Sequence, residues 1–232
     1  MKRLRAIAAY FSGFELILWF SSILLILSSF CIFDRSSFLT LLASLLGVTA
    51  ILLNAKGSPI GQVLMIIFSL IYGCISYDLA YYGEMATYLG MTMPMAVFAL
   101  VAWLRHPYNG NKNEVEVNHL AKGELIFMVL LSLPVTVIFY FILEAFNTAN
   151  IIPSTFSVTT SFIAVYLTFR RSPYFSLAYA FNDLVLLVLW SLAGLKDSKY
   201  LSVLACFLAF LFNDLYAFIS WRRMEKRQRT AK

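Results

Sequence analysis

Long apolar stretches separated by short polar segments make up most of the chain. Each stretch is close to the length of ~20 residues that an α-helix needs to cross a bilayer. The pattern predicts eight membrane-spanning helices, at about residues 14–33, 37–54, 59–78, 84–104, 123–144, 151–169, 174–194 and 199–221. With short connections these helices use almost all of the chain, so no soluble catalytic domain fits beside them.

Composition supports an all-α polytopic membrane protein. Of the 232 residues, 61% are hydrophobic and only 13% are charged, and the mean hydropathy is +0.79. Soluble domains carry about 25% charged residues. Cys31, Cys74 and Cys206 are far apart and lack CxxC spacing, which argues against a disulfide framework or a structural zinc site.

Positive charge is distributed unevenly among the segments that connect the predicted helices. If the N-terminus is cytoplasmic, the external segments hold only Arg35, Lys196 and Lys199 of the 18 lysines and arginines. The positive-inside rule expects this asymmetry, so both termini are predicted on the cytoplasmic side of the cell membrane. The basic tail is then an anchor at an anionic leaflet, and no nucleic-acid partner is expected.

Two parts of the chain carry the same landmarks in the same order. Ser58-Pro59 opens the third predicted span and Ser172-Pro173 opens the seventh, each directly after basic residues. Both parts end on a tryptophan, Trp103 or Trp221, which is followed within two residues by arginine. The order predicts two three-helix units of the same orientation, joined by one connector helix. Transporters built from such repeats bind their substrate at the repeat interface.

This interpretation divides the chain into five segments. The first span is too long for a signal peptide and no cleavage site follows it, so it is expected to be a retained extra helix. The predicted segments are the extra N-terminal helix (1–36), the first three-helix unit (37–104), a cytoplasmic loop with the connector helix (105–150), the second three-helix unit (151–221) and the basic cytoplasmic tail (222–232).

The phrase Phe-Asn-Asp-Leu occurs twice inside apolar spans, at residues 181–184 and 212–215. A carboxylate near the bilayer centre costs roughly 2.5–3.5 kcal/mol on insertion scales, so each aspartate needs a reason. A structural interpretation is that the Asn-Asp pairs hydrogen-bond across helices and hold the bundle together. An amide alone would serve that purpose, which favours ligand or ion contact for at least one aspartate, in one central cavity.

The expected substrate-binding residues come from three predicted spans. They are Tyr179, Asn182, Asp183 and Trp190 in the seventh span, Asn213, Asp214 and Tyr216 in the eighth, and Gln62 and Tyr72 in the third. The third-span residues belong to a polar stripe with Ser69 and Ser76, for which close helix packing is the alternative. Trp221 and the segment Tyr81–Glu84 are interpreted as ordinary residues of the membrane interface.

No catalytic residues, metal ligands or cofactor motif are predicted. His106 and His119 lie in the longest polar loop without a second ligand at metal spacing, and no Ser/His/Asp set or phosphate loop is present. The chain is therefore not expected to be an enzyme.

Several motifs resemble the PnuC family of vitamin transporters over residues 53–225. They are YYGEM (Tyr81–Met85), the close of the fourth span (Pro94, Trp103, Arg105), LAYAFNDLVLLVLW (Leu177–Trp190) and YLSVLACFLAFLFNDLYAFISWRRME (Tyr200–Glu225). The resemblance implies a SWEET-like core of three, one and three helices behind one extra N-terminal helix, and a homotrimer. It also implies facilitated diffusion of an unphosphorylated vitamin, typically nicotinamide riboside for NAD biosynthesis, which a cytoplasmic substrate kinase then traps. Asn182 and Trp190 match the asparagine and aromatic positions of nicotinamide riboside transporters.

Alternatives remain open at this point. Family members also take thiamine, riboflavin or nucleosides, and transport could be coupled to protons through Asp183 or Asp214. A cationic nicotinamide or thiazolium ring is attracted to carboxylates and aromatic faces, which favours either over neutral riboflavin. From a different class, a membrane-embedded receptor or enzyme is the remaining alternative.

Overall fold

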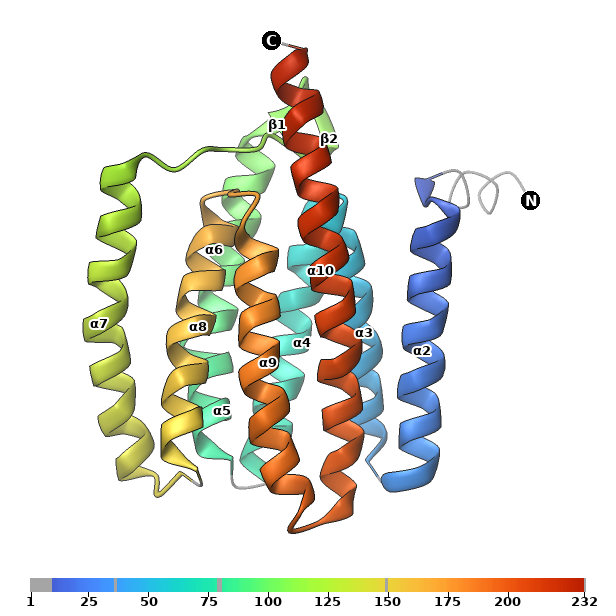
Figure 1. Ribbon diagram of the computed structural model, residues 1–232, viewed down its shortest axis with the longest axis vertical. Helices are drawn as coiled ribbons and strands as arrows, with labels where there is room; N and C mark the ends of the chain where they lie inside the picture. Colours follow the sequence, from blue (N-terminus) through green and yellow to red (C-terminus); the bar gives the residue numbers. More distant parts are fainter. Residues whose placement is uncertain (1–9, 36, 79–80, 149, 232) are drawn as a thin grey trace.

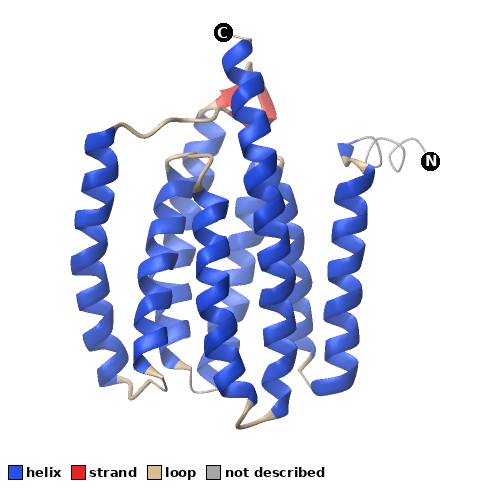
Figure 2. Cartoon of the chain, in the orientation of Figure 1, coloured by secondary structure: helices blue, strands red, loops and turns tan. Residues whose placement is uncertain are grey.

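A computed structural model describes residues 10–35, 37–78, 81–148 and 150–231. The chain folds into one bundle of nearly parallel helices with a small hairpin at one end (Figures 1 and 2). The elements are α2 (Gly13–Phe33), α3 (Phe38–Ala55), α4 (Pro59–Asp78), α5 (Tyr82–Thr87), the π-helix η1 (Tyr88–Thr92), α6 (Met93–Arg105), β1 (Pro107–Tyr108), β2 (Asn111–Val115), α7 (Lys122–Ala145), α8 (Ile151–Phe169), α9 (Phe175–Gly194), the 3-10 helix η2 (Ser198–Tyr200) and α10 (Leu201–Thr230).

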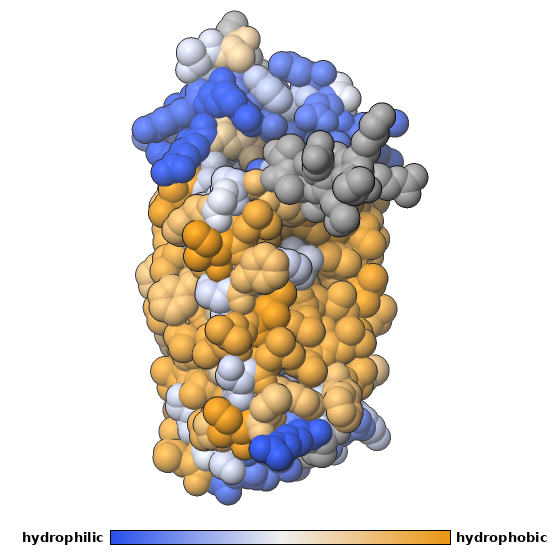
Figure 3. Space-filling view, turned by 90° about the vertical axis from the view of Figure 1, so that its right-hand side faces the viewer, coloured by the Kyte–Doolittle hydropathy of each residue, from blue (hydrophilic) through white to orange (hydrophobic). Residues whose placement is uncertain are grey.

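Eight helical segments in the described part of the chain are long and apolar enough to cross a membrane. Their number and order match the prediction, with α5, η1 and α6 forming one segment over Tyr82–Arg105. The hairpin and the C-terminus lie at one end of the bundle, which we call the basic end; Arg35, Lys196 and Lys199 lie at the opposite, far end. An apolar belt separates the hydrophilic ends (Figure 3).

The basic end is more ordered than predicted, because α10 continues as a helix to Thr230, through most of the expected tail 222–232. The predicted loop between the fourth and fifth spans contains the antiparallel pair β1–β2. Gln228 ties the two together: its side-chain amide donates to Val115 O at 3.0 Å and its oxygen accepts from Val117 N at 2.8 Å. These bonds give the helical extension a partner outside the membrane.

The corners α3–α4 and α8–α9 have the same backbone hydrogen bonds. Ser58 N donates to Leu53 O at 3.1 Å, and Ser172 N donates to Leu167 O at 3.0 Å. Each corner also holds one residue in the left-handed region, a glycine at 57 (φ 68°) and an arginine at 171 (φ 57°). This is a helix-ending pattern that satisfies carbonyls of the last turn, and both Ser-Pro landmarks sit in it.

The two tryptophans that close the predicted units are fully buried at the basic end. Trp103 Nε1 donates to Thr168 O on α8 at 3.0 Å, and Trp221 Nε1 donates to Asn54 O on α3 at 2.7 Å. Their ring centroids are 5.4 Å apart. The prediction that Trp221 is a membrane-interface residue is wrong, because its indole is fully buried and donates to a helix-end carbonyl inside the bundle.

The core lies between α3, α4, α9 and α10, whose buried side chains form the largest apolar cluster. Helices α2 and α7 lie at opposite sides of the bundle (Figure 1) and bury few residues. The interior that is available for a binding site therefore belongs to the two predicted three-helix units.

Candidate functional site

A narrow cavity of about 30 Å³ lies inside the bundle, between the two predicted units. It receives side chains from α3, α4, η1, α8, α9 and α10. The lining residues are Ile51, Asn54, Met65, Phe68, Tyr88, Thr92, Ser161, Phe175, Tyr179, Asn182, Asp183, Phe207, Phe210 and Asp214. Four of the nine expected binding residues are among them: Tyr179, Asn182, Asp183 and Asp214.

The two aspartates of the repeated phrase meet in this cavity. Both are buried, and their carboxyl groups interact electrostatically. Asp183 Oδ2 has no hydrogen-bond partner, and no lysine or arginine of the described chain lines the cavity. A buried acidic pair without a protein cation is expensive to maintain, so the site is suited to a ligand that brings positive charge or hydroxyl donors.

Asn182 is held in one orientation by hydroxyl groups of α8. Its Oδ1 accepts hydrogen bonds from Thr160 Oγ1 at 2.8 Å and from Ser161 Oγ at 3.0 Å. Because the amide oxygen is occupied in this way, its NH₂ group remains available as a donor to a ligand in the cavity.

The π-helix η1 contributes Tyr88 and Thr92 to the cavity. Pro94 follows at the start of α6 and has no N–H group to donate, so a regular helix cannot continue unchanged through this turn. The wider turn occurs directly before this proline, and π-helical turns are frequent at functional sites. Neither Tyr88 nor Thr92 is predicted from sequence, although the proline marks their neighbourhood.

Two expected binding residues on α10 contact the extra helix α2 instead of the cavity. Asn213 Nδ2 donates to Ser22 Oγ at 2.8 Å, and Tyr216 Oη donates to Glu15 Oε1 at 2.8 Å. Consecutive helical residues point about 100° apart, and on α10 this offset turns Asn213 toward α2 while Asp214 faces the cavity. These two residues attach α2 to the bundle.

Gln62, Tyr72 and Trp190 are buried outside the lining. Gln62 Nε2 donates to Asn54 Oδ1 at 2.9 Å, so Gln62 holds the side chain of a lining residue without lining the cavity itself. The Tyr72 hydroxyl lies close to the Trp190 indole, yet neither group makes a hydrogen bond. Both belong to an aromatic region between the cavity and the far end.

Sequence reasoning also missed Asn54, Glu84 and the phenylalanines of the lining. The phenylalanines are Phe68, Phe175, Phe207 and Phe210. Glu84 and Tyr81 lie at the edge of their span, but they are not the ordinary surface residues that the sequence predicts, because their side chains are only 3% and 8% exposed. A polar residue in an apolar span was the available signal for Asn54, whereas nothing in the sequence distinguishes lining phenylalanines from lipid-facing ones.

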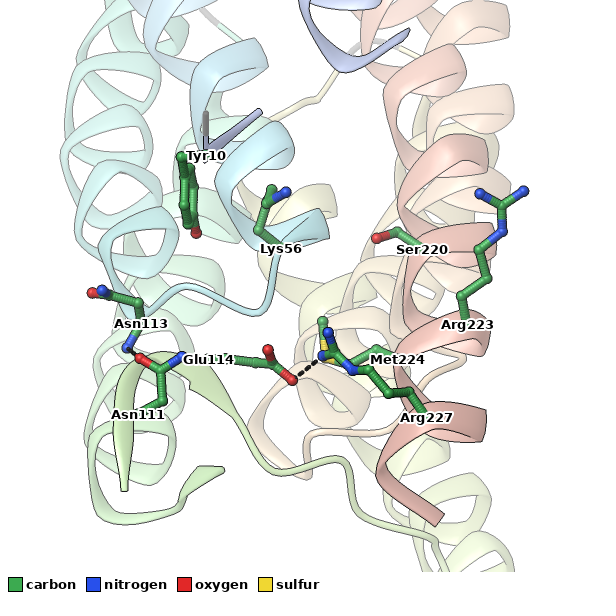
Figure 4. A pocket seen from close by; sticks show the side chains of 9 residues that line it. All are labelled: Tyr10, Lys56, Asn111, Asn113, Glu114, Ser220, Arg223, Met224 and Arg227. Atoms are coloured by element: carbon green, nitrogen blue, oxygen red, sulfur yellow. Dashed lines mark hydrogen bonds and ion pairs between the residues drawn. The ribbon is translucent and has the colours of Figure 1, made fainter. Parts of the chain in front are cut away.

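A second cavity, of about 390 Å³, lies at the basic end (Figure 4). It is lined by Tyr10, Lys56, Asn111, Asn113, Glu114, Ser220, Arg223, Met224 and Arg227. Arg227 pairs with Glu114, and Lys56 Nζ lies 3.2 Å from Glu15 Oε2. None of the expected binding residues lines it. No cluster of His, Cys, Asp or Glu able to hold a metal ion occurs among the described residues.

Comparisons with known proteins agree with this architecture. The family model described as nicotinamide mononucleotide transporter matches residues 37–223, which leaves α2 outside the match. The nicotinamide riboside transporter PnuC of Neisseria mucosa is 24% identical over 201 residues, covering 84% of this chain and 76% of the relative. The crystal structure of the vitamin B3 transporter PnuC superposes with a TM-score of 0.81 at 21% identity, covering 94% of both chains.

The match covers well over half of the chain and includes both predicted units. The solved PnuC structure shares its fold with this multi-pass membrane protein. The chain belongs to the nicotinamide mononucleotide transporter family.

Proposed function

We propose that the protein carries nicotinamide riboside across the membrane by facilitated diffusion and catalyses no reaction. The observation that carries this proposal is the buried pair Asp183 and Asp214, which has no protein cation beside it in the central cavity. The relative from Neisseria mucosa bears the name of a nicotinamide riboside transporter. A cationic nicotinamide ring supplies the charge that the pair lacks.

The lining offers a partner for each part of such a ligand. Aromatic rings from Phe68, Tyr88 and Tyr179 can stack on a flat cationic ring, an interaction worth about 0.5–2 kcal/mol per contact. Asn182 donates from its NH₂ group, and the aspartates accept from ribose hydroxyls. Gln62, Asn213 and Tyr216 are left out of the proposed contacts because their side chains bond elsewhere.

Binding requires the bundle to open. The cavity of about 30 Å³ holds on the order of one or two water molecules, whereas ligand sites usually measure ~300–1,000 Å³. We assign residues 37–104 and 151–221 to two SWEET-like units, with α7 as the connector in 105–150, that rock about the cavity. The matching corners and the two tryptophan bonds between the units support this assignment.

The orientation and assembly follow from charge and from family resemblance. The basic end is assigned to the cytoplasm of the cell. Only three of the described lysines and arginines, Arg35, Lys196 and Lys199, lie at the far end, and the positive-inside rule places the end with more basic residues in the cytoplasm. A homotrimer and trapping by a cytoplasmic substrate kinase are carried over from the resemblance. Light scattering of the detergent-solubilised protein tests the trimer.

Uptake of labelled nicotinamide riboside into vesicles that contain the purified protein tests the substrate. We expect saturable uptake that excess unlabelled nicotinamide riboside abolishes, with thiamine and riboflavin as weaker competitors. Uptake no faster than into empty vesicles, together with transport of thiamine, would reject the substrate. Tight binding without exchange across the membrane would indicate a receptor.

Proton coupling is a second candidate, favoured by the two buried carboxyl groups that line one cavity. Two neighbouring acids in an apolar site repel each other less when one carries a proton, and an arriving cation can replace that proton. Coupling predicts that a pH gradient drives uptake in the wild type and that Asp183→Asn or Asp214→Asn removes this dependence. Wild-type uptake that ignores the gradient excludes it.

A further inference from the structure

Glu84 is a buried acid near the far end, at the third residue of α5. Its side chain is 3% exposed, and Oε2 has no hydrogen-bond partner. None of the ion pairs among the described residues includes Glu84; the far-end Lys199 pairs with Asp197 at 3.0 Å. An unpartnered carboxyl in an apolar bundle is costly, and it is therefore a functional candidate.

Other unpartnered polar groups occur in the same part of the bundle, where Tyr72 interacts electrostatically with Glu84 and the Trp190 ring packs on Tyr81. The hydroxyls of Tyr72 and Ser76 on α4 and the indole N–H of Trp190 on α9 are buried without hydrogen bonds. Native proteins leave few such groups, so several in one region require an explanation. Three separate elements, α4, α5 and α9, contribute to this cluster.

The cluster connects Glu84 to the central acidic pair. Glu84 interacts electrostatically with Tyr72 and Tyr88, and Tyr88 interacts in turn with Asp183. Tyr88 lies one helical turn beyond Glu84 and lines the central cavity. The rings of Tyr72 and Tyr88 are 4.4 Å apart, so aromatic faces continue from the cavity to Glu84.

The aromatic residues of this region extend away from the acidic pair along α9. On α9, Trp190 lies seven residues beyond Asp183, which is roughly 10 Å along the helix. The Trp190 ring packs against Tyr81 at 4.9 Å, three residues before Glu84 in the chain. The aromatic faces of Tyr81 and Trp190 thus lie about 10 Å beyond Asp183 in the direction of the far end.

We propose that Glu84, with Tyr72, Tyr81 and Trp190, forms a second binding station for a positively charged aromatic ring, between the far end and the central cavity. This station rests on the proposed transport function. A cation entering from the far end meets the Glu84 carboxyl and the tyrosine and tryptophan faces before it reaches Asp183. The station selects cationic over neutral rings at entry, since a neutral ring gains no charge attraction from Glu84.

The test compares Glu84→Gln with the wild type in vesicle uptake of two ring forms. Nicotinamide riboside carries a positive ring, and its dihydro form has nearly the same shape with a neutral ring. We expect E84Q to lower uptake efficiency for the cationic form about tenfold, equivalent to ~1.4 kcal/mol, and to change that for the neutral form less than about twofold. Glu84→Asp keeps the charge and is expected to retain the preference for the cation.

Glu144→Gln is the matched control, because Glu144 is an exposed acid at the same end of the bundle. It is expected to behave like the wild type with both compounds. Equal losses for the two ring forms in E84Q, or a preference unchanged from that of E144Q, would overturn the station. The preference is a ratio, so a lower amount of folded E84Q protein does not alter it. Absence of wild-type uptake would instead reject the transport function, and the station with it.

Discussion

The wall of the central cavity built by α8, α9 and α10 differs in charge from the wall built by α3, α4 and η1. The first carries Asn182, Asp183 and Asp214, whereas the second offers only uncharged polar groups such as Asn54 and Thr92. Both walls stand on the same kind of corner and are tied by matching tryptophan bonds. The two units therefore have the same corners and tryptophan hydrogen bonds, whereas the charged lining residues come only from the second unit.

The binding residues expected from sequence likewise include acids only in the seventh and eighth spans, but the neutral wall is made of other residues than expected. The polar stripe Gln62, Ser69, Tyr72 and Ser76 does not line the cavity. Asn54 at the end of α3 and the π-helical residues Tyr88 and Thr92 take its place. Asn213 was expected on the acidic wall, but it does not line the cavity and instead donates a hydrogen bond to Ser22 on α2.

Removing charge from the acidic wall should have the largest effect. Asp183→Asn is expected to lower uptake of nicotinamide riboside about 100-fold, ~2.8 kcal/mol, because the cationic ring loses its counter-charge. Asp78→Asn, at an exposed acid on α4, serves as the control and should leave uptake unchanged. Initial rates of nicotinamide riboside uptake into vesicles measure the effect. If Asp183→Asn transports as fast as the wild type, the charge difference between the two walls does not matter for transport.

Matched amides on the two walls should differ in a measurable way. Asn182→Ala is expected to raise the apparent Kd of nicotinamide riboside about tenfold, because its NH₂ group donates to the ligand. Asn54→Ala should raise it less than about threefold, since Asn54 lies on the wall without carboxylates and is not among the proposed ligand contacts. Thermal-shift titration of the purified variants measures both. Equal effects would indicate that the neutral wall binds as strongly as the acidic one.

The shared frame predicts similar losses of stability on the two sides. Trp103→Phe and Trp221→Phe each remove one buried hydrogen bond to a helix-end carbonyl that keeps a backbone donor, so each loss is about 0.5–1.5 kcal/mol. Both variants should therefore unfold at lower temperature by similar amounts. A large loss for only one of them would contradict equivalence of the two units at this end.

The smallest effect on transport is expected where α10 meets α2. Tyr216→Phe removes the hydrogen bond to Glu15, worth about 1 kcal/mol of stability, and lies outside the cavity. Uptake should stay within about twofold of the wild type, while the melting temperature falls slightly. A large loss of uptake at normal stability would place Tyr216 on the substrate path after all.

The sequence alone determined how many segments can cross the membrane and which polar residues inside them are energetically costly. Spanning a bilayer demands about 20 apolar residues whatever the packing, so the eight segments are visible in the composition of each stretch. The cost of a carboxylate in that environment likewise marks Asp183 and Asp214 without any structure.

Only the tertiary structure decided which side of each helix faces the cavity. In a soluble protein the apolar face of a helix points to the core, but lipid tails are as apolar as the interior, so that signal is weak here. Rotation about each helix axis was set by packing and by polar partners on neighbouring helices. That is why Asp214 faces the site while Asn213 faces α2, why Trp221 is buried against a helix end, and why Glu84 lies inside the bundle.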